Sequence, residues 1–487
     1  MDGLFLRVAM ALMLALGWAG WGAPAHAVQP LLTKACVLGA QTAIPLARAR
    51  QADGWNCAAG TDDLTHRHLW MRIDGGRIEA RERLVLRSDA LHFGGLLTVV
   101  ELPDGSVRQR YHDAEALARQ WTVGTRFAVP LIEAGEQPRR IWLRVDEPLD
   151  RNAAALAEVV PGDADSGQRF VGMVLFALFA GMMLVVAVYS LALSVALRSK
   201  LALWHGAMSA MFLVYTVSSS SLAFMFLPDL SLWARSATSY LALAFSIALV
   251  APFFRALLED GMLPRWAIPI LYAASAIVAL AGLGFVALAH QLPFVARPVY
   301  HAAYLPVLAA FVMVCVIAWR RGSRIMRVVT LAWSVPALVA VDRILRGMNI
   351  YLLPHEWDFA FYAAMAWQSV IMAIGITLRI GLLRLERDLA RAKERSLGEL
   401  AQTDGLTGLP NRRAFDERDW RGGDFLAIVD ADHFKQINDR HGHQAGDRVL
   451  AAIGAELRHS VAVDRGCLAA FRMGGEEFGL LVAPLSE

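Results

Sequence analysis

The chain has 487 residues, of which 56% are hydrophobic and 19% are charged. Soluble proteins average about 45–50% hydrophobic and about 25% charged residues, so this composition argues against a wholly soluble protein. The 47 lysines and arginines outnumber the 44 aspartates and glutamates by only three, which is too few to suggest a basic face for nucleic acid. We therefore expect a multidomain protein with a membrane part and no nucleic-acid partner.

The first 27 residues are typical of a cleaved signal peptide. Arg7 precedes an apolar run, and the run leads to Ala25-His26-Ala27, the small-x-small pattern of a cleavage site. An uncleaved membrane anchor is the alternative, but the run is shorter than the roughly 20 apolar residues of a membrane span. We therefore expect the segment that follows to be exported.

Residues 28–168 predict an exported sensor domain with a β-sandwich fold. Apolar and polar residues alternate in short segments such as 69–73 and 140–145, and turn sequences rich in Asp, Gly and Pro separate them. Cys36 and Cys57 both lie in this segment. They either form a disulfide, which an oxidising compartment favours, or remain two free thiols.

Seven long apolar runs follow within residues 169–383, each near or above the length that crosses a membrane as a helix. They cover residues 170–197, 201–227, 232–254, 266–289, 299–319, 328–345 and 358–383. If the N-terminal domain is outside, most basic loop residues lie on the inner side, in agreement with the positive-inside rule. This predicts a protein of the bacterial inner membrane with a periplasmic N-terminal domain and a cytoplasmic C-terminus.

Asp342 and Arg343 are ionisable residues near the outer end of the sixth run. Charge at membrane depth is costly and often marks a pathway, so a role in relay or gating is one interpretation. The other is that the Arg343 side chain simply extends to the membrane surface.

The order of exported β domain, seven helices and cytoplasmic output resembles the bacterial seven-transmembrane receptors with diverse intracellular signalling modules. The resemblance implies that the periplasmic domain is a jelly-roll. It also implies that this domain binds a small molecule such as a carbohydrate.

Residues 384–401 are predicted to form a signalling helix. Leu382, Leu385, Leu389 and Ala392 recur at spacings of three and four among charged residues. A short parallel coiled coil of two chains is one interpretation, and a solvated charged linker helix is the other.

From residue 402 onwards the sequence predicts an α/β domain with an acidic site. Residues 425–429 form a continuous apolar run typical of a buried strand, and Asp430 follows it directly. Gly474 and Gly475 precede Glu476, and glycines permit a tight hairpin whose backbone can approach a phosphate. If that hairpin lies beside the first strand, Asp430 and Glu476 converge on one or two Mg²⁺ ions.

Four segments in this region together resemble the GGDEF domain, the catalytic module of diguanylate cyclases. They are DGLTGLPNRR at 404–413, DADHFKQIND at 430–439, GHQAGD at 442–447 and GGEEF at 474–478. The match covers about residues 403–482. It implies a palm-like α/β fold that condenses two GTP molecules into cyclic di-GMP, with one GTP on each protomer of a homodimer.

The resemblance also implies which residues hold the metal and perform the reaction. Asp430 and Glu476 would bind Mg²⁺ or Mn²⁺, and the carbonyl of Ala431 would assist them. Glu477 would belong to the same acidic cluster, near the 3′-hydroxyl that loses its proton. Glu476 and Glu477 are therefore the candidate catalytic residues.

A second set of residues is implied to bind GTP. Asn438 and Asp447 would hydrogen-bond the guanine, the backbone amides around Phe434 and Lys435 would hold the phosphates, and Gly474 and Gly475 would form the turn that the nucleotide approaches.

The sequence departs from the family pattern in two places. Arg465-Gly466-Cys467-Leu468 keeps the arginine but not the aspartate of the Arg-x-x-Asp product-inhibition site, so we expect no feedback through that site. The chain also ends nine residues after Phe478, so we expect residues 402–487 to form a truncated, incomplete GGDEF domain. The predicted function is a receptor-type diguanylate cyclase, and the alternative is a sensory receptor whose GGDEF domain is an inactive fragment.

Overall fold

The computed structural model describes residues 35–75, 83–89, 93–352, 358–418, 425–464 and 466–483. The predicted signal peptide and Arg465 lie outside these residues. The chain divides into two compact units, one up to Arg379 and one from Ile380 onwards. Each unit is described by itself below.

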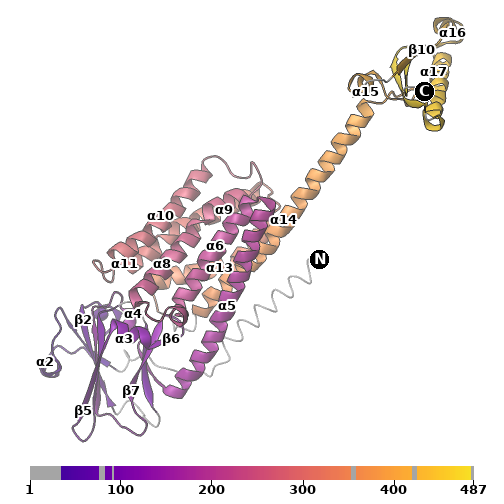
Figure 1. The fold of residues 1–487 in the computed structure, drawn as a ribbon. Coiled ribbons are helices and arrows are strands. Elements are labelled where there is room, and N and C mark those ends of the chain that lie inside the picture. The colour runs from indigo at the N-terminus through magenta and orange to yellow at the C-terminus, as the bar shows by residue number, and fades with distance from the viewer. Residues whose placement is uncertain are drawn as a thin grey trace. The chain divides into compact units, whose positions relative to one another are not determined.

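The first unit begins with a β domain of two antiparallel sheets (Figure 1). One sheet has the order β1-β2-β8-β4-β5 and the other the order β6-β7-β3-β9. The strands are β1 (Ala35–Ala40), β2 (His68–Asp74), β3 (Leu84–Asp89), β4 (Gly95–Glu101), β5 (Val107–Asp113), β6 (Trp121–Thr122), β7 (Arg126–Ile132), β8 (Arg140–Asp146) and β9 (Glu158–Pro161). Short helices connect them: α2 (Leu46–Gln51), η2 (Thr61–Leu64), α3 (Ala114–Arg119) and α4 (Asn152–Ala155).

The two sheets of the β domain share one apolar core. Met71 and Leu143 of the first sheet lie in the same buried cluster as Leu86 and Val129 of the second. Every second residue of a strand faces the same side, and Trp70, Val99 and Trp142 of the first sheet form a separate buried cluster with Ala49 of α2. The predicted β domain is confirmed, whereas its description as a jelly-roll stays a prediction. The structure also joins Cys36 to Cys57 in a disulfide.

Within the described residues, seven helical segments are long and apolar enough to cross a membrane. They are α5 (Gly162–Leu197), α6 (Lys200–Ser219), α8 with α9 (Leu232–Ala248 and Val250–Leu257), α10 (Ala267–Leu288), α11 with α12 (Ala296–Ala302 and Tyr304–Arg320), α13 (Met326–Gly347) and α14 (Asp358–Ala401). The second ends at Ser219, earlier than the apolar run suggested, and the short α7 (Ala223–Phe226) follows it. The chain is a multi-pass membrane protein.

The β domain rests on one end of the helices. The Gly124 amide donates to the Ser220 carbonyl at 3.2 Å, and the Ser221 hydroxyl donates to the Gly124 carbonyl at 2.6 Å. Phe224 and Leu232, from the helical region, belong to the same apolar cluster as the core of the β domain. The junction is therefore packed like a domain interior.

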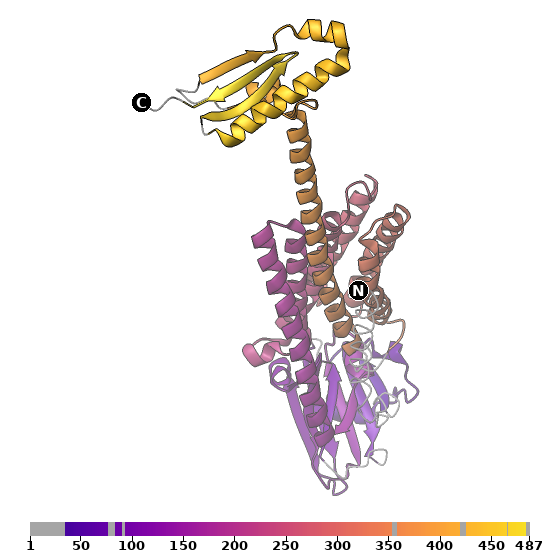
Figure 2. The same cartoon turned by 90° about the vertical axis from the view of Figure 1, so that its right-hand side faces the viewer.

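The second unit contains the end of α14 and a three-stranded antiparallel sheet of order β10-β12-β11. Its other elements are β10 (Phe425–Asp430), β11 (Cys467–Gly474), β12 (Glu477–Val482), α15 (Arg412–Asp416), α16 (Phe434–His441) and α17 (His443–Val463). Helix α17 lies along one face of the sheet (Figure 2), where Leu450 packs in a buried cluster with Ala470 and Phe478.

The continuous apolar run at residues 425–429 forms the expected strand, but the prediction that it is buried is wrong. All six residues of β10 are exposed, with Phe425 at 62% and Ile428 at 70%. Among the described residues β10 pairs only with β12, at the edge of the sheet. Apolar composition predicted the strand correctly, but burial depends on what packs over it.

Candidate functional site

The acidic residues of the second unit lie at the end of β10 and in the hairpin between β11 and β12. Asp430 is the last residue of β10, and its cross-strand partner is Glu477, the first residue of β12. Gly474 and Gly475 have φ angles of +152° and +52°, which a residue with a Cβ adopts only with strain. The hairpin therefore lies beside β10, as the convergence of these acids on one metal would require.

Asp430 and Glu477 are both exposed and directly opposite each other. Like charges in such cross-strand positions repel, and a divalent cation would remove that repulsion. No three acidic, His or Cys side chains are gathered around one point in the described part of the chain. Mg²⁺ is often held by one or two carboxylates together with substrate phosphates, so Asp430 with the acids of this hairpin fits such a metal without a protein cage.

Arg472 connects the hairpin to the motif at residues 404–413. Its guanidinium forms an ion pair with Asp404 at 3.0 Å and donates to the carbonyl of Gly475 at 2.8 Å. Its backbone amide donates to the carbonyl of Pro410 at 2.8 Å. The glycine turn is thus held at one end by a segment about 70 residues earlier in the chain.

The environment of Asp404 favours its charged form. Burial acts against it, but hydrogen bonds from the hydroxyl and amide of Thr407 and the guanidinium of Arg472 hold the pKa of this carboxyl below its ordinary value. Asp404 opens the motif at residues 404–413 and Arg472 lies two residues before Gly474, but the sequence alone gives neither of them a role. Their spacing of 68 residues carries no local signal of contact.

The structure brings Asn438 of α16 next to the start of α17. A Cβ on Gly446 would lie 2.0 Å from the Oδ1 atom of Asn438, so only glycine permits this approach. Among the described residues this buried Oδ1 atom has no hydrogen-bond partner. Asp447, the next residue of α17, is exposed. An open acceptor of α16 therefore lies against the first turn of α17, which also carries the carboxylate of Asp447.

The segment after β10 reverses sharply into α16. His433 has a φ of +58°, and α16 begins at Phe434. The Phe434 side chain is buried in the core, and that of Lys435 is exposed. The carbonyl of Ala431 accepts a bond from the Phe434 amide at 3.2 Å and keeps a second lone pair.

A β domain, seven membrane-length helices and an α/β unit with an acidic hairpin define a multidomain membrane protein. Comparison with known families agrees. The family of 7TM diverse intracellular signalling proteins matches residues 172–379, and the family of diguanylate cyclase GGDEF domains matches residues 401–487. The chain therefore contains both domains, which confirms the two resemblances.

Curated relatives match in the GGDEF region. The chain is 48% identical over 95 residues to diguanylate cyclase DgcP of Pseudomonas aeruginosa, covering 18% of this chain and 14% of the relative. It is 37% identical over 142 residues to diguanylate cyclase TpbB of the same species, covering 27% of this chain and 32% of the relative. It is 43% identical over 94 residues to the response regulator PleD of Caulobacter vibrioides, covering 17% and 20%. The chain thus spans about a third or less of the length of these relatives.

Proposed function

We propose that this protein is a membrane receptor that condenses two molecules of GTP into cyclic di-GMP and two pyrophosphates. The observation that carries the proposal is the register of Asp430 against Glu477 beside a glycine turn, inside a GGDEF domain. Relatives named diguanylate cyclase match the same region.

In this proposal the acidic residues hold the metal and remove a proton. Asp430, Glu476 and the free lone pair of the Ala431 carbonyl bind Mg²⁺ or Mn²⁺, which neutralises charge on the α-phosphate. Glu477 accepts the proton of the attacking 3′-hydroxyl. The new bond joins O3′ to the α-phosphorus of the second GTP, and the bond from that phosphorus to the pyrophosphate leaving group breaks. The reciprocal attack, by O3′ of the second GTP on the α-phosphorus of the first, closes the ring and releases the second pyrophosphate.

The remaining residues orient the nucleotide. The open acceptor of Asn438 and the carboxylate of Asp447 match the N–H donors on the edge of guanine. The amides at the start of α16, around Phe434 and Lys435, bind phosphate oxygens. Apart from the chain neighbours, no atom of the described residues lies within 4 Å of a Cβ placed on Gly474 or Gly475, so the turn leaves room for the nucleotide.

One GTP on each of two protomers requires a homodimer. Leu382, Leu385 and Leu389 of α14 are 57%, 56% and 61% exposed, and Ala392 is exposed too. An apolar stripe at heptad spacing on an exposed helix favours a coiled coil with the same helix of a second chain. We propose this contact as the dimer interface.

We further propose that the β domain is periplasmic and the GGDEF domain cytoplasmic, in the bacterial inner membrane. The disulfide between Cys36 and Cys57 favours an oxidising compartment for the β domain. GTP is a cytoplasmic substrate, so the GGDEF domain lies on the other side. Control by a periplasmic small molecule such as a carbohydrate, bound to the β domain, is part of the same proposal.

A sensory receptor with an inactive GGDEF domain is the second candidate. The exposed apolar face of β10 favours it, because a catalytic strand is normally supported on at least one face. The two candidates differ only in whether the acidic hairpin turns over GTP.

The test uses the full chain in lipid nanodiscs, incubated with GTP and Mg²⁺ and then with EDTA in place of the metal. We expect cyclic di-GMP and pyrophosphate with Mg²⁺ and neither product with EDTA. A dimeric sample that binds GTP but yields no cyclic di-GMP with Mg²⁺ or Mn²⁺ would favour the inactive receptor instead.

A further inference from the structure

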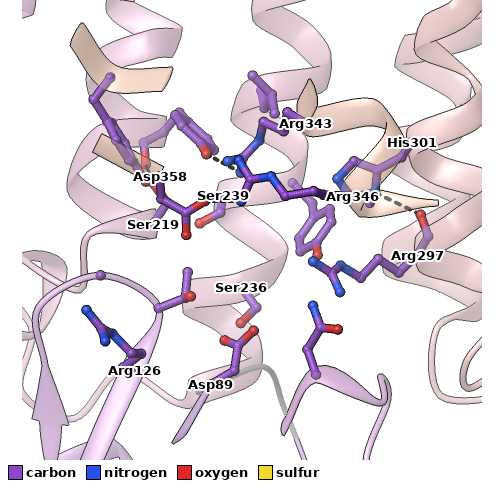
Figure 3. A pocket seen from close by; sticks show the side chains of 18 of the residues that line it. Asp89, Arg126, Ser219, Ser236, Ser239, Arg297, His301, Arg343, Arg346 and Asp358 are labelled. Carbon is purple, nitrogen blue, oxygen red and sulfur yellow. Dashed lines mark hydrogen bonds and ion pairs between the residues drawn. The ribbon is translucent and has the colours of Figure 1, made fainter. Parts of the chain in front are cut away.

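A polar cavity lies between the β domain and the helix ends of the first unit (Figure 3). Its volume is about 120 Å³, whereas one water needs only about 10–15 Å³. Asp89 and Arg126 reach it from the β domain, and Arg297, Arg343 and Arg346 reach it from α11 and α13. The cavity is thus large enough for an organic group and is built by both parts of the unit.

The three arginines from α11 and α13 differ in how they are neutralised. Arg297 forms an ion pair with the buried Asp150, and Arg346 forms ion pairs with Asp342 and Asp358 at 2.8 Å. The remaining one, Arg343, has no carboxylate within ion-pair distance among the described residues.

Arg343 instead contacts aromatic groups. It donates to the hydroxyl of Tyr215 at 2.5 Å, and its guanidinium carbon lies 4.5 Å from the centre of the Phe361 ring. The Nε atoms of Arg297 and Arg343 are buried and have no hydrogen-bond partner in the described part of the chain. Buried donors without partners are rare and costly, so this wall of the cavity is suited to an anion.

A second cavity adjoins the first and is almost entirely apolar. It offers about 90 Å³ by the same measure and extends between α8, α12, α13 and α14. Leu243, His301 and Arg343 line both cavities, so the two meet at Arg343. Along α13 the lining runs from Trp333 to Arg343, about 15 Å at the rise of a helix.

We propose that the two cavities form one binding site for an amphiphilic anion. Arg343 and Arg297 hold its acidic head group, and an acyl or alkyl tail fills the apolar cavity along α13. A guanidinium suits a carboxylate or phosphate because its planar N–H groups match the oxygens, and the apolar walls suit a hydrocarbon chain. A free fatty acid and a membrane phospholipid share this chemistry.

The test measures thermal unfolding of the full chain in phosphatidylcholine nanodiscs, with four added probes. Dodecanoate has both head and tail, butyrate has the head with a short tail, dodecanol has the tail without the charge, and inorganic phosphate has the charge alone. A ligand that binds only the folded state raises the unfolding temperature. Each buried methylene favours binding about fourfold, so we expect dodecanoate to act at a concentration at least about a hundredfold below butyrate.

Two variants test the head-group contact and the tail cavity separately. Arg343→Gln removes the cationic donor, and we expect dodecanoate to bind at least about tenfold more weakly. Ala337→Phe places a ring in the apolar cavity, which Ala337 lines, and leaves the arginines in place. We expect a comparable loss of the dodecanoate response, even if Arg343→Gln proves too unstable to measure.

Each variant has a control on the same helix. Leu338→Phe adds a ring next to Ala337, at a position that is 74% exposed on the bundle surface, and Arg327→Gln removes an exposed charge at the other end of α13. Both controls should respond like the wild type. The proposal is overturned if dodecanoate does not raise the unfolding temperature of the wild type, or if butyrate or dodecanol raises it just as strongly at the same concentration. It is also overturned if all four variants respond equally to dodecanoate.

A further arm distinguishes the two sources of the ligand. Nanodiscs with added phosphatidylglycerol should abolish the response to dodecanoate if a phospholipid fills the site, and should leave it unchanged if the ligand is a free fatty acid. Binding here does not require turnover of GTP. A chain that binds dodecanoate but makes no cyclic di-GMP would contradict the proposed function and not this inference.

Discussion

The acidic hairpin of the GGDEF domain and the arginine cavity of the first unit both gather charged side chains, but at opposite degrees of exposure. Asp430 and Glu477 are open to solvent, whereas Asp150, the partner of Arg297, is only 1% exposed. Water screens exposed like charges, so the acidic pair is tolerated without a bound counter-ion. Buried charges need partners within the protein, and the cavity arginines have carboxylates, hydroxyls or rings around them. In our proposals the exposed acids bind an exchangeable metal, whereas the buried ion pairs hold the β domain on the helices around the cavity.

The largest effect should follow from removing the exposed acids. The double variant Asp430→Asn/Glu477→Gln takes away a metal ligand and the proposed base, and a catalytic metal contributes several kcal/mol to the barrier. We expect cyclic di-GMP formation from GTP to fall by at least about a hundredfold. Because both side chains are exposed, the unfolding temperature should not change. Glu456→Gln, an exposed acid on α17, is the control and should keep full activity.

In the buried region, by contrast, removing a charge should lower the unfolding temperature. Arg297→Gln leaves the carboxylate of Asp150 buried without its ion-pair partner, which costs about 3 kcal/mol of folding free energy. The unfolding temperature of the full chain should fall, and the double variant Asp150→Asn/Arg297→Gln should recover part of the loss. Equal unfolding temperatures for Arg297→Gln and the wild type would show that this pair does not hold the junction.

The exposed site, unlike the buried one, requires a second chain in our proposal. Leu389→Asp places a charge in the apolar stripe of α14, and burial of one leucine favours association by about 1.5–3 kcal/mol. We expect the dimer to dissociate at least about tenfold more readily in sedimentation experiments. Arg391→Asp, two residues away and on another side of the helix, should dimerise like the wild type. Equal dissociation of the two variants would remove the stripe as the interface.

A smaller effect concerns the contact that holds the glycine turn. Arg472→Gln breaks a partly buried ion pair with Asp404 and a bond to Gly475, which together contribute about 1–2 kcal/mol. Hydrogen exchange of the amides at 404–411 and 474–478 in the full chain should become about 5- to 30-fold faster. Arg413→Gln breaks only an exposed ion pair with Glu417 and should leave these rates unchanged.

The smallest effect is a dependence on pH. The pKa of Asp404 is lowered in the folded protein, so this carboxylate stabilises the hairpin above its ordinary pKa of about 4, and that contribution is lost as the pH falls further. The difference in hydrogen exchange between the wild type and Asp404→Asn should be largest near neutral pH and shrink below about pH 4. A difference that stays constant down to pH 3 would argue against the ion pair with Arg472.

Much of the fold could be predicted because the signals are local. The apolar runs identified the seven membrane-length helices, since a membrane span must satisfy its own backbone within about 20 residues. Alternation identified strands such as β2 and β8 in the β domain. The burial of β10 was predicted wrongly, because the same apolar composition fits a covered strand and an exposed edge.

The two candidate sites differ in how far the sequence revealed them. The acidic hairpin was found because its glycines and acids lie next to one another and belong to recognisable motifs. The pairing of Asp404 with Arg472 was missed, since 68 residues separate them. From the sequence alone, Arg343 is either a functional charge within the membrane or a side chain that extends to the membrane surface. Its contacts with Tyr215 and Phe361 come from other helices.

The sequence by itself determined the composition of each part: a β domain, a run of apolar helices, and a set of GGDEF motifs with their acids and glycines. These features arise from neighbouring residues, whose spacing decides whether a segment is a strand, a helix or a turn. Only the tertiary structure decided which acid faces Asp430, that β10 is exposed, and that arginines of α11 and α13 meet the β domain around one cavity. Contacts between distant segments depend on how whole elements pack, and local sequence patterns do not predict that packing.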